Sequence, residues 1–189
     1  MRRQAAALLT LFLTVLTLAA QQDKSKRPSP PGTADFTFAD GKKVAIDYSR
    51  PFAKGRKIDG GLVPNNEPWR TGANEATSLK TDTDLVIGGT SVPAGSYTIY
   101  SLRTPDSWKL IINKQTGQWG TVYNQDQDLA RIDMKVSSPP SPVEQFTMSF
   151  EKTGADSANL VLDWGTLRGT VDVKNKGAKP APPGGVTAR

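Results

Sequence analysis

The chain has 189 residues, 24 basic and 18 acidic, and contains neither cysteine nor histidine. Lacking both residue types, it cannot form disulfides, cysteine nucleophiles, Ser-His-Asp triads, or metal sites built from imidazole or thiolate. The net charge of +6 arises at the chain ends, because residues 34–173 carry 15 basic and 17 acidic side chains, a net charge of −2. This balance argues against nucleic acid as a partner.

The first 20 residues are typical of a secretory signal peptide. Arg2 and Arg3 form a basic start, and an apolar run then extends from residue 5 to residue 18. That run is shorter than the ~20 residues that a membrane-spanning helix needs. Small residues at Thr17 and Ala19 favour cleavage after Ala19 over cleavage after Ala20. We expect an exported protein, periplasmic or extracellular, with no membrane span in the mature chain. An uncleaved membrane anchor is the alternative.

Polar segments flank the predicted domain on both sides. Residues 21–33 are rich in proline, and residues 175–189 form a basic tail. Neither segment has enough apolar surface to offset the entropy lost on ordering, so we expect a flexible linker and a disordered tail. Residues 34–174 have a usual length for one domain.

Within residues 34–174, apolar and polar side chains alternate with the period of two that β-strands require. The clearest windows are 43–49, 131–136, 145–151, 159–164 and 170–173. Segments 97–102 and 108–113 are apolar on both faces, which places them centrally in a sheet. The pair Gly88-Gly89 predicts a two-residue hairpin. We predict an all-β fold, a single antiparallel β-sandwich of jelly-roll type.

Residues 51–73 interrupt the strand pattern. Loops of this length are uncommon in compact domains and are usually functional or disordered. Ile58, Leu62, Val63 and Trp69 give this stretch apolar side chains to bury, which favours a long ordered loop.

Residues suited to ligand binding gather around this loop. Arginine guanidinium groups recognise carboxylates and phosphates with paired hydrogen bonds, and a tryptophan can stack on a sugar or hold a cation. The candidate ligand-binding residues are Arg50, Arg56, Trp69, Arg70, Asn74 and Glu75. The ligand class they suggest is a small polar or anionic molecule, or a glycan.

Other interpretations of the same residues stay open. The arginines and Glu75 could form a purely architectural network. With no histidine or cysteine, a hydrolase of extracytoplasmic carbohydrate would rely on a carboxylate pair, and Glu75 with Asp47 is the first pair to consider. A structural domain that meets a partner through its edge strands is a further alternative.

No catalytic residue, cofactor or metal site is predicted. Residues 124–128 alternate oxygen-bearing side chains, but Asn and Asp are also ordinary turn residues. Trp108, Trp119 and Trp164 lie on strand patterns, so we interpret them as core residues.

Several motifs resemble those of an uncharacterised bacterial family, domain of unknown function 2911. They are Tyr48-Ser-Arg-Pro51, Gly55-Arg56, Trp69-Arg-Thr-Gly-Ala-Asn-Glu-Ala-Thr77, Pro93-Ala-Gly-Ser-Tyr97 and Trp108–Asn113. The resemblance implies an exported protein with a β-rich domain, and it implies no activity. The chain departs from the family at Asp59-Gly60-Gly61, where family members more often carry an apolar or aromatic residue.

Overall fold

The computed structural model describes residues 23–177, so the predicted signal peptide (1–20) and residues 178–189 of the predicted tail lie outside it. Strands dominate this part of the chain, together with two short 3-10 turns, η1 (Lys24–Lys26) and η2 (Gln125–Gln127). The strands are β1 (Pro31–Thr37), β2 (Lys43–Ser49), β3 (Pro68–Trp69), β4 (Thr77–Thr81), β5 (Leu85–Ile87), β6 (Thr90–Val92), β7 (Gly95–Arg103), β8 (Trp108–Asn113), β9 (Asp128–Ser137), β10 (Val143–Gly154), β11 (Ser157–Gly165) and β12 (Leu167–Asn175).

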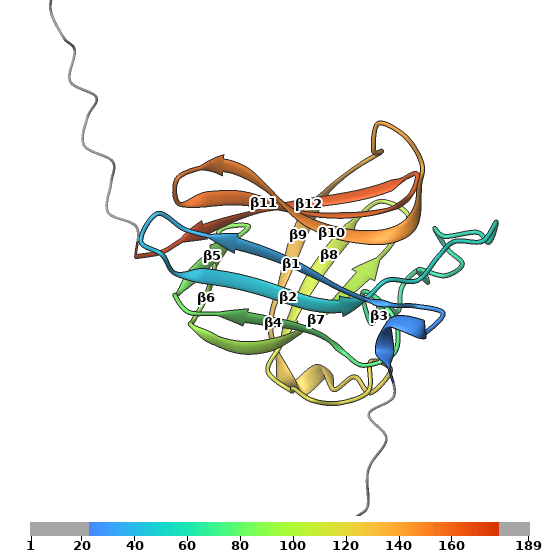
Figure 1. The fold of residues 1–189 in the computed structure, drawn as a ribbon, viewed down its shortest axis with the longest axis horizontal. Helices are drawn as coiled ribbons and strands as arrows, with labels where there is room; N and C mark the ends of the chain where they lie inside the picture. The colour runs from blue at the N-terminus through green and yellow to red at the C-terminus, as the bar shows by residue number, and fades with distance from the viewer. Residues whose placement is uncertain (1–22, 178–189) are drawn as a thin grey trace, which may run out of the picture.

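The strands form one antiparallel sheet that curls back on itself (Figure 1). Its order is β1-β2-β4-β7-β8-β9-β12-β11-β10, with β3 beside β7 and the β5–β6 hairpin beside β12. The two ends of this path, β1 and β10, lie side by side without a backbone ladder. The all-β antiparallel prediction is confirmed, and the sheet is nearly closed and barrel-like. The finer division into two jelly-roll layers stays a prediction.

The strands expected at the centre lie there. β7 and β8 pair with each other and occupy the middle of the path, and Tyr100 and Ile111 are buried on the side away from the main core. The Gly88-Gly89 hairpin is also confirmed. Both glycines adopt positive φ, 52° and 80°, which lets a two-residue turn follow the twist of β5 and β6.

Side chains rather than a ladder join the two ends of the sheet. Tyr48 on β2 reaches across β1 to β10, where its hydroxyl accepts from the Met148 amide at 2.8 Å and donates to the Met148 carbonyl at 3.3 Å. Gly32 lies opposite Tyr48 on β1. A Cβ there would stand 3.3 Å from the Tyr48 ring and 2.4 Å from Arg50 Cδ, so glycine makes room for both crossing side chains.

Both ends of this seam carry further bonds. Arg50 donates to the Phe146 carbonyl at 3.3 Å and to the Thr147 hydroxyl at 3.0 Å. The chain after β2 continues the contact, since the Phe146 amide donates to the Pro51 carbonyl at 2.9 Å. At the opposite end the Ala39 amide donates to the Ala155 carbonyl at 3.1 Å. These contacts place the long loop directly beside β10.

Aromatic side chains fill the interior near the seam. Trp69 stacks on Trp164 with ring centroids 5.7 Å apart, and Phe146 meets Trp69 edge-on at 5.1 Å. Trp108 and Trp164 are buried, as expected from their strand patterns, and Trp69, a candidate ligand-binding residue, is buried with them.

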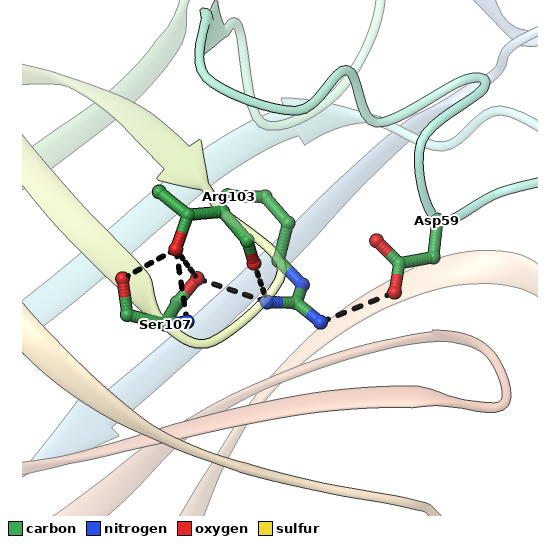
Figure 2. Close-up of polar contacts among 4 residues, drawn as sticks. Asp59, Arg103 and Ser107 are labelled. Atoms are coloured by element: carbon green, nitrogen blue, oxygen red, sulfur yellow. Dashed lines mark hydrogen bonds and ion pairs between the residues drawn. The ribbon is translucent and has the colours of Figure 1, made fainter.

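An ion pair ties the long loop to the β7–β8 hairpin (Figure 2). Arg103, at the end of β7, is buried and donates to Asp59 Oδ2 at 3.1 Å. It also donates to the carbonyls of Thr104 and Ser107 in the hairpin turn. The segment Asp59-Gly60-Gly61 therefore supplies the carboxylate that this arginine meets.

The folded region extends beyond the predicted boundaries at both ends. β1 begins at Pro31, inside the predicted linker, because pairing with β2 satisfies its backbone. Asn175, assigned to the tail, is buried and bonds to Thr83 and Asp40. Among residues 23–177, no helix is long and apolar enough to cross a membrane.

Replacing Tyr48 with phenylalanine is expected to loosen the seam. The change leaves the buried amide and carbonyl of Met148 without their partner, at a cost of roughly 1–3 kcal/mol in the free energy of unfolding. Urea denaturation measures this. The control is Tyr97→Phe, which removes one bond to the nearby Pro93 carbonyl and should cost less. An equal or smaller loss for Tyr48→Phe would contradict the role of the seam.

Candidate functional site

The segment Trp69–Thr77 connects β3 to β4 through an unusual backbone path. Thr71 and Asn74 have positive φ values of 49° and 60°. For a β-branched residue such as threonine this conformation is strained. Buried contacts hold it in place. The Thr71 hydroxyl donates to the Trp69 carbonyl at 3.2 Å, and the Thr77 hydroxyl donates to the Thr71 carbonyl at 2.8 Å.

Close packing against the end of β2 explains two further residues of this segment. A Cβ at Gly72 would lie 2.9 Å from the Thr77 hydroxyl and 3.1 Å from the Ser49 carbonyl. Asn74 donates to the Ser49 hydroxyl at 3.1 Å and to the Ser29 carbonyl at 3.0 Å. The amide of Asn74 thus joins three segments of the chain, which is an architectural use of a residue predicted to bind ligand.

The structure distributes the six candidate residues over several places. Arg50 lies in the seam, and Trp69 lies in the core. Arg56 is exposed and donates to the carbonyls of Ala53 and Phe52, within its own loop, at 3.0 and 2.7 Å. Glu75 and Arg70 line two different cavities. Trp69 lines the same cavity as Arg70, and Arg56 lines a third one.

The first cavity, of about 210 Å³, surrounds Glu75. Arg27 contacts both carboxylate oxygens of Glu75, at 2.9 and 2.8 Å, and Lys24 lies 3.2 Å from Oε1. Both basic residues belong to the segment before β1. Asp47 and Ser78, opposite each other on β2 and β4, line the same cavity.

These contacts decide the charge of Glu75. The Arg27 guanidinium, with smaller contributions from the Glu75 amide and from Lys24, lowers the pKa of Glu75 to about 2. A carboxyl with this pKa is ionised at neutral pH and cannot serve as a general acid. Asp47 lines the same cavity, but Glu75 cannot be the protonated member of a glycosidase carboxylate pair.

The second cavity, of about 240 Å³, lies beside Arg70. Tyr100 and Tyr123 form part of its wall, with ring centroids 4.8 Å apart in an edge-on arrangement. Their hydroxyls are already engaged, since Tyr100 donates to the Val122 carbonyl at 2.7 Å and Tyr123 to Asp128 at 2.6 Å. Desolvation, followed by Asp128, raises the pKa of Tyr123 to about 12, so both phenols stay neutral. The cavity therefore offers neutral aromatic rings and one cation.

Arg70 differs from the other arginines of the described chain. Seven arginines lie between residues 23 and 177. Six donate side-chain hydrogen bonds to described residues: Arg27, Arg50, Arg56, Arg103, Arg131 and Arg168. Arg70 is half-buried, yet its guanidinium has no hydrogen bond or ion pair with any described residue. Within the segment Trp69–Thr77, it is the charged side chain without a described internal partner, since Glu75 pairs with Arg27 and Lys24.

One exposed aromatic residue was predicted wrongly. Trp119 was expected in the core, but it is 49% exposed. It forms an isolated antiparallel bridge with Glu75 in the connection after β8. The strand-like alternation around Trp119 did not reveal its exposure, because the burial of this side chain depends on whether a distant segment of the chain covers it.

The oxygen-rich stretch 124–128 folds as a turn. The Asn124 side chain accepts from the Asp126 amide at 3.0 Å, and Asp128 accepts from Asn113, Tyr123 and Arg131. Within the described residues, no three acidic side chains gather as they would around a metal ion.

The pKa of Glu75 predicts a specific pH dependence. Because the folded pKa of about 2 lies below the unfolded value of 4.5, Glu75 contributes stability above pH 4.5 and loses it as the pH falls toward 2. The side chain is 41% exposed, so the contribution is on the order of 1 kcal/mol or less. Urea denaturation between pH 6 and 2 should show a flatter profile for Glu75→Gln than for the wild type.

The exposed Glu67 offers the matched control, since it has no ion pair with a described residue. Glu67→Gln should leave the pH profile of the wild type unchanged. Overlapping profiles for Glu75→Gln and the wild type would show that the contacts with Arg27 and Lys24 do not stabilise the fold.

Comparison with known proteins supports a single assignment. Neither the search of curated proteins nor the search of solved structures finds a match. A family model does match, over residues 29–173, which includes the seam, the segment Trp69–Thr77 and the cavity beside Arg70, but not Lys24 and Arg27 of the first cavity. The chain belongs to the family described as "Protein of unknown function (DUF2911)".

Proposed function

We propose that this protein is an exported binding module that holds a small anionic ligand at Arg70. The observation that carries the proposal is Arg70, a partly buried residue whose guanidinium lacks any described internal partner and borders a cavity of about 240 Å³. No nitrogen of Arg70 is among the buried unpaired atoms of the described residues, so the guanidinium is open to the cavity. A ligand that brings a carboxylate or phosphate to this cavity would provide the missing partner.

The chemistry of the wall supports an anion. Both tyrosine hydroxyls already donate internal hydrogen bonds, so the two tyrosines present mainly their apolar rings to the cavity. A charge-assisted bond is stronger in such surroundings, and the planar guanidinium can donate two parallel bonds to a carboxylate or phosphate. The cavity is smaller than the 300–1,000 Å³ common for drug-sized ligands, which favours a small ligand.

An architectural role for Arg70 makes a different prediction. If Arg70 stabilised the fold, its removal would lower the free energy of unfolding, as expected for Arg50 in the seam. Because Arg70 has no described partner, we expect the free energy of unfolding of Arg70→Gln to lie within about 0.5 kcal/mol of the wild-type value.

The binding test uses isothermal titration calorimetry at low ionic strength with inorganic phosphate, sulfate and glucuronate as probes. We expect the wild type to bind at least one probe, and Arg70→Gln to bind it at least tenfold more weakly, because the guanidinium is the cation at the cavity. The matched control is Arg56→Gln, the same change on an exposed arginine outside the cavity, which should retain full affinity.

Two results would contradict the proposal. One is unchanged affinity in Arg70→Gln. The other is equal loss in Arg70→Gln and Arg56→Gln, which would indicate nonspecific attraction of anions to a basic side chain.

Export is supported by the basic, apolar and small-residue order of residues 1–20. Expression of the full chain in a bacterial host should yield a shortened protein outside the cytoplasm. Mass spectrometry should show an N-terminus at Ala20 or Gln21. Intact Met1 on a membrane-bound product would instead support the uncleaved anchor.

A further inference from the structure

Trp119 presents an aromatic surface beside a charged group. It forms an antiparallel bridge with Glu75, and side chains directly opposite each other in such a bridge project to the same face. The indole is 49% exposed, whereas the three other tryptophans are at most 7% exposed. The fold therefore places its one exposed tryptophan opposite Glu75, a residue that lines the first cavity.

The groups around Glu75 leave hydrogen-bonding capacity for a ligand. Arg27 and Lys24 occupy about three of the roughly four acceptor positions of the carboxylate. Lys24 is 58% exposed, and its ammonium contacts no described residue except Glu75. The Ser78 side chain and the Asp47 carboxylate line the same cavity without side-chain hydrogen bonds to described residues. Donors and acceptors thus line one small cavity together.

We infer that Trp119 and the cavity around Glu75 form a binding site for a neutral sugar ring. A pyranose has a face of C–H groups that packs on an aromatic ring and a rim of hydroxyls that both donate and accept. The indole suits the first feature, and Glu75, Lys24, Asp47 and Ser78 suit the second. A purely apolar partner would leave these charged groups desolvated and unpaired, which is unfavourable.

This site is separate from the anion site at Arg70. A Cβ on Gly120, the residue after Trp119, would lie 2.8 Å from Arg70 Cδ. Successive residues of an extended segment point to opposite faces, so Arg70 lies behind the segment whose front carries Trp119. The two sites can therefore be tested independently.

The exposure of Trp119 offers a direct readout. Acrylamide quenches exposed tryptophans preferentially, and Trp119 is the exposed one among the four of this chain. We expect at least one of maltotriose, cellotriose and chitotriose to reduce quenching and shift the emission to shorter wavelength. No protection by any of these probes would overturn the inference.

Calorimetry on variants, with the sugar that protects Trp119 from quenching, then tests whether Trp119 forms part of the binding site. Trp119→Ala should weaken binding about tenfold or more, and Trp119→Tyr, which keeps an aromatic ring, should restore most of it. Val122→Ala, a truncation of an equally exposed residue nearby, should bind as the wild type. Affinity unchanged in Trp119→Ala would overturn the inference.

Arg70→Gln should bind the sugar with unchanged affinity. Loss of sugar binding in that variant would contradict the separation of the two sites. Near-ultraviolet circular dichroism of each variant establishes that its core aromatic packing is retained.

Discussion

The hydroxyl of Tyr48, bonded to both backbone groups of Met148, is the contact on which the rest of the structure depends. An antiparallel sheet that curls without closing leaves two strand edges unpaired, and unpaired edges are exposed to aggregation. Here side chains join the edges. This junction requires glycine at position 32, because any Cβ there would obstruct Tyr48 and Arg50 as they cross β1.

The seam also positions the candidate binding surface. Because Arg50 and Pro51 attach the chain to β10, the long loop begins beside the seam and returns through β3 into the strained segment around Thr71. Ion pairing of Arg103 with Asp59 anchors the middle of that loop (Figure 2). The segment Trp69–Thr77 then lies between the start of β1 and the connection after β8, with one cavity on each side.

Within the segment Trp69–Thr77, the residues differ in whether their side chains are already held by contacts inside the protein. Trp69, Thr71 and Asn74 are occupied by packing or hydrogen bonds. Glu75 keeps part of its acceptor capacity, and Arg70 has no described partner. Strain at Thr71 is maintained by buried bonds, which is the arrangement expected where a backbone holds side chains in place for binding. The family motif thus combines a scaffold with two side chains directed at two cavities.

Local patterns in the sequence were sufficient to predict the all-β antiparallel fold, the central position of β7 and β8, the Gly88-Gly89 hairpin and the family. Each of these follows from side-chain alternation or from the backbone freedom of glycine, which act over a few residues. Tertiary structure decided the rest. Arg50, Arg56, Arg70 and Glu75 look alike as candidates in sequence, but Arg50 and Glu75 meet partners far along the chain, Thr147 and Arg27, whereas Arg56 bonds only within its own loop and Arg70 has no described partner. Exposure of Trp119 and the missing partner of Arg70 likewise depend on which distant segments cover them, and no local pattern records that.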